Sequence, residues 1–84
     1  MKKVLITGAT SGIGYATLKE LVNKYEVIFT YHHNEEKALE ITSKYHIKGY
    51  YLDLGDKESI EKLVDSIDNI DILINNAAIC LDNS

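Results

Sequence analysis

The 84 residues allow one small domain, and a composition with 45% hydrophobic and 26% charged residues is typical of a globular protein. The net charge of −4 argues against sequence-independent binding of nucleic acid, which needs clustered lysine and arginine. No apolar run approaches the ~20 residues of a membrane span. The single cysteine, Cys80, excludes an intrachain disulfide and favours a reducing, cytoplasmic setting.

The hydrophobic pattern alternates between short apolar runs and amphipathic segments along the whole chain. In chain order it predicts a strand at 3–7, a helix at 12–24, a strand at 26–31, a helix from an Asn34 cap to about Tyr45, a strand at 48–54, a helix capped by Asp56, and a strand at 71–75. In the last helix, the apolar residues at helical spacing are Ile60, Leu63, Val64 and Ile67.

This order predicts a doubly covered parallel sheet. Helices between consecutive strands permit right-handed crossovers, which place helices on both faces of the sheet. The strands read as near-continuous apolar runs, as strands covered on both faces should. We expect an α/β fold with the strand order 3-2-1-4 and a ligand crevice at the carboxyl ends of the first and fourth strands.

Three glycines, Gly8, Gly12 and Gly14, lie between the first strand and the first helix. Glycine adopts positive φ at little cost, and its missing side chain lets a ligand approach the main chain. The free N–H groups at a helix start attract anions, aided by the helix dipole. The loop is therefore predicted to hold the pyrophosphate of a dinucleotide, and a loop that only tightens the turn is the alternative.

Three segments placed on this frame resemble short-chain dehydrogenases/reductases. Residues 7–14 are similar to the family's TGxxxGIG motif, and Asp53-Leu54 looks like its adenine contact. Residues 71–78 resemble the motif of the fourth strand, with Ala78 where the family usually has glycine, and residues 79–83 are similar to 3-oxoacyl-(acyl-carrier-protein) reductases. The resemblance implies that residues 1–84 are the N-terminal part of a Rossmann-like, dinucleotide-binding domain.

The resemblance also implies a cofactor site. Its members would be Gly8, Ala9, Thr10, Ser11, Gly12, Ile13 and Gly14 around the pyrophosphate and adenosine ribose, Asp53 and Leu54 at the adenine, and Asn76 and Ala77 toward the nicotinamide ribose. Two other interpretations stay open. Asp53 could simply begin a turn, and the asparagines could end a strand by satisfying backbone groups.

The end of the second predicted strand bears on the choice of cofactor. The segment 30–34 contains no acid, whereas NAD-binding relatives usually carry one there for the ribose diol. A carboxylate would repel a 2′-phosphate, so its absence favours NADP, and His32 could hydrogen-bond that phosphate. Ser11 stands where many NADP-dependent relatives have arginine, so NAD stays the alternative.

The family's catalytic Ser, Tyr-x-x-x-Lys and Asn would lie beyond residue 84. The pair Tyr15 and Lys19 has this spacing, but it falls on the first helix, where an exposed i,i+4 pair is expected. No residue of this chain is therefore assigned a catalytic role. The histidines show no zinc-like spacing, so no metal is expected either.

The resemblance implies an oxidoreductase that transfers hydride between NADP(H) and a carbonyl/alcohol pair. We expect this chain to be a piece of a longer reductase and to be inactive alone. A non-catalytic dinucleotide-binding sensor and an assembly module with a vestigial site are the alternatives. In a truncated sheet the fourth strand would be an unprotected edge, which predicts self-association through residues 71–76.

Overall fold

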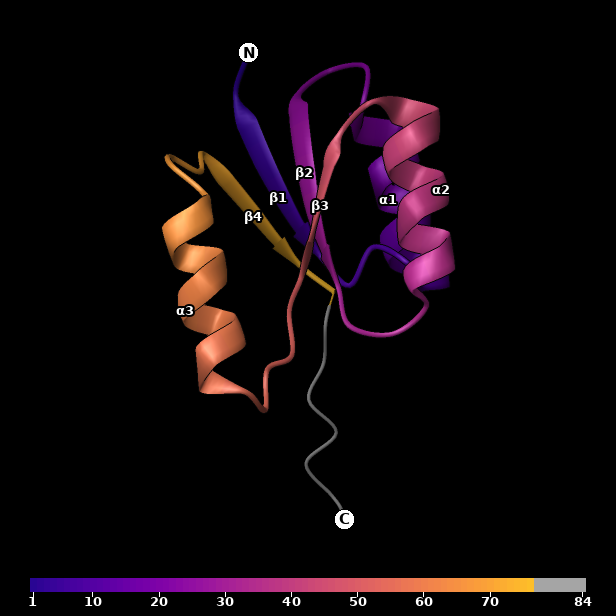
Figure 1. Ribbon diagram of the computed structural model, residues 1–84. Coiled ribbons are helices and arrows are strands. Elements are labelled where there is room, and N and C mark those ends of the chain that lie inside the picture. Colours follow the sequence, from indigo (N-terminus) through magenta and orange to yellow (C-terminus); the bar gives the residue numbers. More distant parts are fainter. Residues whose placement is uncertain (77–84) are drawn as a thin grey trace.

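The computed structural model describes residues 1–76, which form a four-stranded parallel sheet with helices on both faces (Figure 1). The elements are β1 (Lys3–Thr7), α1 (Gly12–Leu21), β2 (Glu26–Tyr31), α2 (Glu35–Tyr45), β3 (Lys48–Tyr51), α3 (Lys57–Ser66) and β4 (Ile72–Asn75). The strand order is β3-β2-β1-β4, which confirms the predicted topology. None of the helices in this part of the chain is long and apolar enough to cross a membrane.

The register brings the carboxyl ends of neighbouring strands to one edge. Ile6 lies opposite Phe29 of β2 and Ile74 of β4, and Thr7 lies opposite Asn75. The loops that follow β1, β2 and β4 therefore leave the sheet at the same edge.

The main core lies on the face of the sheet covered by α1 and α2. Its largest fully buried apolar side chains are Phe29, Ile6, Leu18, Ile41 and Val4. Alternate strand residues point to opposite faces, so Leu5 and Ile28 face α3, on the other side of the sheet (Figure 1). The helices thus bury both faces of the central strands, as the continuous apolar runs predicted.

Two predicted elements are longer than those observed. The first helix, predicted at 12–24, ends at Leu21, whose carbonyl accepts the N–H groups of both Lys24 and Tyr25 in a closing turn. The strand predicted at 48–54 ends at Tyr51. Asp53 already belongs to a turn there, because its carboxylate accepts the Gly55 N–H at 2.9 Å.

The predicted buried face of α3 was wrong at one position. Val64 is 63% exposed, whereas Leu63 is buried. Ser59 is buried as well, since its hydroxyl accepts the Asp53 N–H at 2.8 Å. A polar contact to the preceding loop thus places the helix, and apolar spacing alone did not reveal it.

The strand β4 lies at one side of the sheet. Among residues 1–76 it pairs only with β1, and the side chain of Leu73 is 61% exposed. The described part of the chain therefore leaves the outer edge of β4 without a strand partner. Self-association through this edge stays a prediction.

Candidate functional site

A groove of about 570 Å³ lies at the carboxyl ends of the strands. Its lining residues come from the loops that follow all four strands: Gly8, Thr10, Ser11, His32, His33, Asn34, Leu52, Asp53, Leu54, Gly55 and Asn76. A second groove of about the same volume lies at the opposite end of the strands, beside Lys3, Glu26 and Lys48. Only the first includes residues of the glycine loop.

The loop after β1 is held in place by β2. Gly8 has φ of 68°, a left-handed conformation that glycine adopts without strain. Its N–H donates to the Thr30 hydroxyl at 3.3 Å, and the Ala9 N–H donates to the Thr30 carbonyl at 3.2 Å. One buried threonine thus fixes the chain as it leaves the sheet.

Gly12 and Gly14 have different structural reasons to be glycine. A Cβ on Gly14 would collide with the Gly8 carbonyl oxygen, so Gly14 permits close packing of α1 on the loop. A Cβ on Gly12 would meet no atom of the described residues within 4 Å. The open space at Gly12 leaves room for a ligand against the main chain.

The start of α1 differs from the other helix starts. Asn34 caps α2 by accepting the Lys37 N–H, and Asp56 caps α3 by accepting the Glu58 N–H. The Ser11 side chain makes no such bond to α1 and instead donates to the Gly8 carbonyl at 2.9 Å. The first-turn N–H groups of α1 therefore lack a capping side chain, which suits an anionic ligand.

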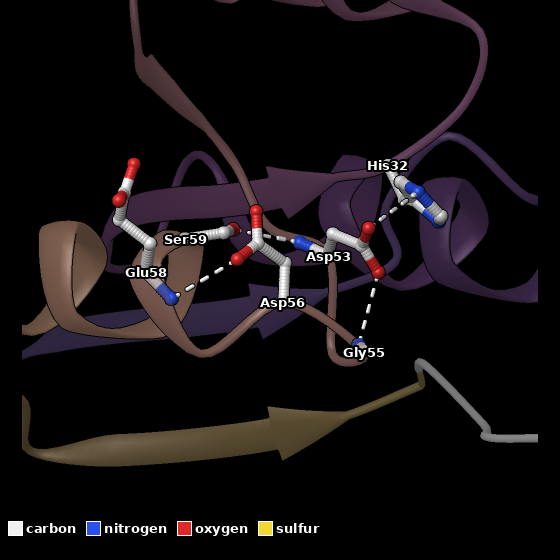
Figure 2. A network of polar contacts seen from close by, with 6 residues as sticks. All are labelled: His32, Asp53, Gly55, Asp56, Glu58 and Ser59. Carbon is white, nitrogen blue, oxygen red and sulfur yellow. Dashed lines mark hydrogen bonds and ion pairs between the residues drawn. The ribbon is translucent and has the colours of Figure 1, made fainter.

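Asp53 is the centre of a polar network beside the groove (Figure 2). One carboxylate oxygen accepts the Gly55 N–H, and the other lies 3.6 Å from His32 Nε2. The Asp53 and His32 side chains are 32% and 42% exposed. The turn-forming role considered for Asp53 is therefore present, together with a contact that joins the ends of β2 and β3.

The ends of β1 and β4 are joined by side chains. The Thr7 hydroxyl donates to Asn75 Oδ1 at 2.7 Å and accepts the Asn76 N–H at 3.0 Å. Asn76 Nδ2 is buried and has no hydrogen-bond partner among the described residues. An amide donor that lines the groove is thus available to a ligand acceptor.

The groove brings together seven of the predicted cofactor residues, namely Gly8, Thr10, Ser11, His32, Asp53, Leu54 and Asn76. Ala9 and Gly14 are buried beneath the loop, whereas Gly12 and Ile13 are exposed at the start of α1. Ala77 lies outside the described residues.

Sequence reasoning missed four of the lining residues: His33, Asn34, Leu52 and Gly55. Each is within two positions of a predicted member, in the loop after β2 or β3. Strand ends alone would have indicated them, because parallel strands direct their following loops to one edge.

The Tyr15–Lys19 pair lies away from the groove. Lys19 Nζ is 4.9 Å from the centre of the Tyr15 ring, and the hydroxyls of Tyr15 and Tyr45 are 3.4 Å apart. The hydrogen bond with Tyr15, together with burial, raises the pKa of Tyr45 above its ordinary value. Tyr15 therefore joins α1 to α2. Within residues 1–76, no three His, Cys, Asp or Glu side chains gather in a way that could hold a metal.

A sequence-family model described as short chain dehydrogenase matches residues 2–84. The chain belongs to the short-chain dehydrogenase family. It is 44% identical over 89 residues to the 3-oxoacyl-[acyl-carrier-protein] reductase of Haemophilus influenzae, covering 98% of this chain and 36% of that protein. It is 40% identical over 91 residues to an NADP-dependent 3-hydroxy acid dehydrogenase of Schizosaccharomyces pombe, covering 95% of this chain and 35% of that protein.

Solved structures agree with this assignment. BdcA in complex with NADPH matches with a TM-score of 0.82 and 28% identity, covering 99% of this chain and 34% of that one. The closed form of serine dehydrogenase complexed with NADP⁺ matches with a TM-score of 0.80 and 31% identity, covering 94% of this chain and 34% of that one. This member of the short-chain dehydrogenase family therefore has the Rossmann-type arrangement, and it spans about a third of the length of these relatives.

Proposed function

We propose that this chain supplies the NADP(H)-binding part of an oxidoreductase acting on a carbonyl/alcohol pair. The observation that carries the proposal is the uncapped start of α1 beside a groove at the carboxyl ends of the strands. The main-chain N–H groups of Gly12, Ile13 and Gly14 would bind the pyrophosphate, since they combine unpaired donors with the positive end of the helix dipole.

Two further features fit a dinucleotide. Gly12 leaves open space where a side chain would otherwise stand, and Asn76 Nδ2 is a buried donor without a protein partner in the described part of the chain. An unsatisfied buried donor carries a cost that a ligand oxygen would remove. Asp53 and Leu54 would contact the adenine, and Asn76 would face the nicotinamide ribose. The bound cofactor supplies the hydride that the reaction transfers.

The choice of NADP over NAD rests on the residues that follow β2. His32, His33 and Asn34 line the groove there, and none of them is an acid that would bind a ribose diol. Two of the similar proteins, the 3-hydroxy acid dehydrogenase and serine dehydrogenase, are named for NADP or complexed with it. NAD is the alternative that the titration below compares directly.

The chain is proposed to be inactive by itself. It spans 36% and 35% of the two curated relatives, and its tyrosine–lysine pair at catalytic spacing packs on α1, outside the groove. The activity, with a 3-oxoacyl thioester as one possible substrate, belongs to a longer protein in this proposal. A binding sensor on the same fold would bind the dinucleotide without supporting turnover in any longer form.

The test is a fluorescence titration of the 84-residue chain with NADPH and NADH, followed by a reductase assay with a 3-oxoacyl thioester. We expect saturable binding with preference for NADPH, and no substrate-dependent oxidation. The Gly12→Ala variant is the control for a site at the start of α1, and it should fold but bind more weakly. Absence of binding by the folded chain would refute the proposal, and turnover by the isolated chain would refute its catalytic part.

A further inference from the structure

The groove contains a single pair of opposite potential charges. Of its lining residues within the described chain, only Asp53 is acidic, and only His32 and His33 can carry a positive charge. His32 Nε2 lies 3.6 Å from the Asp53 carboxylate, and Figure 2 shows the two side chains directed toward each other. The acid of the groove therefore has its own counter-charge, brought from another strand.

This arrangement matters for a phosphorylated ligand. An unpaired carboxylate repels a nearby phosphate, and the repulsion acts across a groove that only partly screens it. A protonated His32 would cancel that charge and leave its other ring nitrogen, which makes no hydrogen bond within residues 1–76, to donate to an oxygen. The same side chain would thus remove a repulsion and add a contact.

We propose that His32 masks the charge of Asp53 and thereby admits the 2′-phosphate of NADP to a groove that would otherwise favour NAD. This inference rests on the proposed function, and it assigns the preference between the two dinucleotides to the pair rather than to His32 alone. Asp53 is already committed to the turn through the Gly55 N–H, so its carboxylate stays in place whether or not the histidine is charged.

The mask depends on the protonation of His32. The groups that face its ring are Asp53, the His33 ring at 4.0 Å between centroids and the Tyr51 ring at 5.7 Å. Histidine is the side chain that ordinarily changes charge between about pH 5 and 8. The preference for NADP should therefore be larger near pH 6.5 than near pH 8.5 in the unaltered chain and should lose this dependence in His32→Ala.

The test is calorimetric titration of NADP⁺ and NAD⁺ into four variants: His32→Ala, Asp53→Asn, the double variant, and His32→Ala with Asp56→Asn. Asparagine at 53 keeps the oxygen that accepts the Gly55 N–H. Asp56 is the matched control, because it lies in the same loop, does not line the groove, and would still cap α3 as asparagine. Circular dichroism checks that each variant is folded.

We expect His32→Ala to lower the ratio of NADP⁺ to NAD⁺ affinity about tenfold, because it loses a charge-assisted hydrogen bond and exposes the Asp53 charge. Adding Asp53→Asn should restore the ratio by about threefold, whereas adding Asp56→Asn should not. Asp53→Asn alone should weaken both dinucleotides without lowering their ratio.

Three results would overturn the inference: an unchanged ratio in His32→Ala, no recovery in the double variant, or a fall of the ratio in Asp53→Asn as large as in His32→Ala. The last result would mean that Asp53 positions His32 instead of being masked by it. If the unaltered chain binds neither dinucleotide, the proposed function fails and this inference fails with it. Binding of both at one constant ratio overturns only the inference.

Discussion

Replacing Gly14 by alanine should destabilise the fold, whereas the same change at Gly12 should not. The added Cβ at Gly14 would overlap the Gly8 carbonyl oxygen and lie 3.0 Å from the Cα of Ala9. These are backbone atoms that cannot rotate away, and Ala9 is fully buried. Overpacking of this kind costs about 1–3 kcal/mol. At Gly12 the added methyl would meet no described atom within 4 Å.

Helix propensity works in the opposite direction at both positions, because alanine is favoured over glycine by up to about 1 kcal/mol inside a helix. For Gly14→Ala, the backbone overlap should exceed this gain by roughly 1–2 kcal/mol. In a domain of this size, that loss lowers the melting temperature by roughly 4–16 °C. Gly12→Ala should melt at or slightly above the temperature of the unaltered chain.

The assay is thermal unfolding by circular dichroism, paired with the NADPH titration. Gly12→Ala should keep its melting temperature and lose affinity, which would assign the open space at Gly12 to the ligand. A Gly14→Ala chain that melts within about 2 °C of the unaltered protein would refute the packing argument, because a shift that small corresponds to well under 1 kcal/mol.

Three further predictions concern other parts of the chain. Thr30→Val removes the acceptor of the Gly8 N–H in a fully buried position and should cost about 1–3 kcal/mol, which urea denaturation would measure. The pKa of Tyr45 is raised mainly by its hydrogen bond with Tyr15, so the phenol contributes stability below its ordinary pKa of 10.0 that is lost as pH rises through the higher folded value. Ultraviolet titration should show Tyr15→Phe moving that pKa back toward 10.0, and no movement would contradict the assigned cause. At ~100 µM the chain should sediment larger than a monomer, and Leu73→Lys should reduce its size, because a charge at a strand edge opposes pairing; a monomeric unaltered chain would contradict the open-edge prediction.

The topology could be predicted from the sequence because the hydrophobic period changes at each element. The strand order followed from right-handed crossovers and needed no distant contact. The face of α3 could not be predicted in the same way, since Ser59 is buried by a hydrogen bond to the Asp53 N–H. Apolar spacing therefore placed Val64 on the wrong side.

The candidate site was predictable to a similar extent. The motif residues fall at strand ends, so seven of them meet in one groove. Their different tasks were hidden, because only the coordinates separate Gly14, which packs against Gly8, from Gly12, which leaves open space. The contact of His32 with Asp53 joins loops that follow different strands, and no local pattern reports such a pair.

The two bonds from Thr30 to the loop after β1 have a consequence for the order of events in folding. Gly8 and Ala9 cannot take their final conformation until β2 lies beside β1, because both partners of their amides belong to β2. The anion-binding loop is then shaped by closure of the first crossover. Amide hydrogen exchange should report this, with the Gly8 and Ala9 protons released in the same opening event as the β1–β2 ladder.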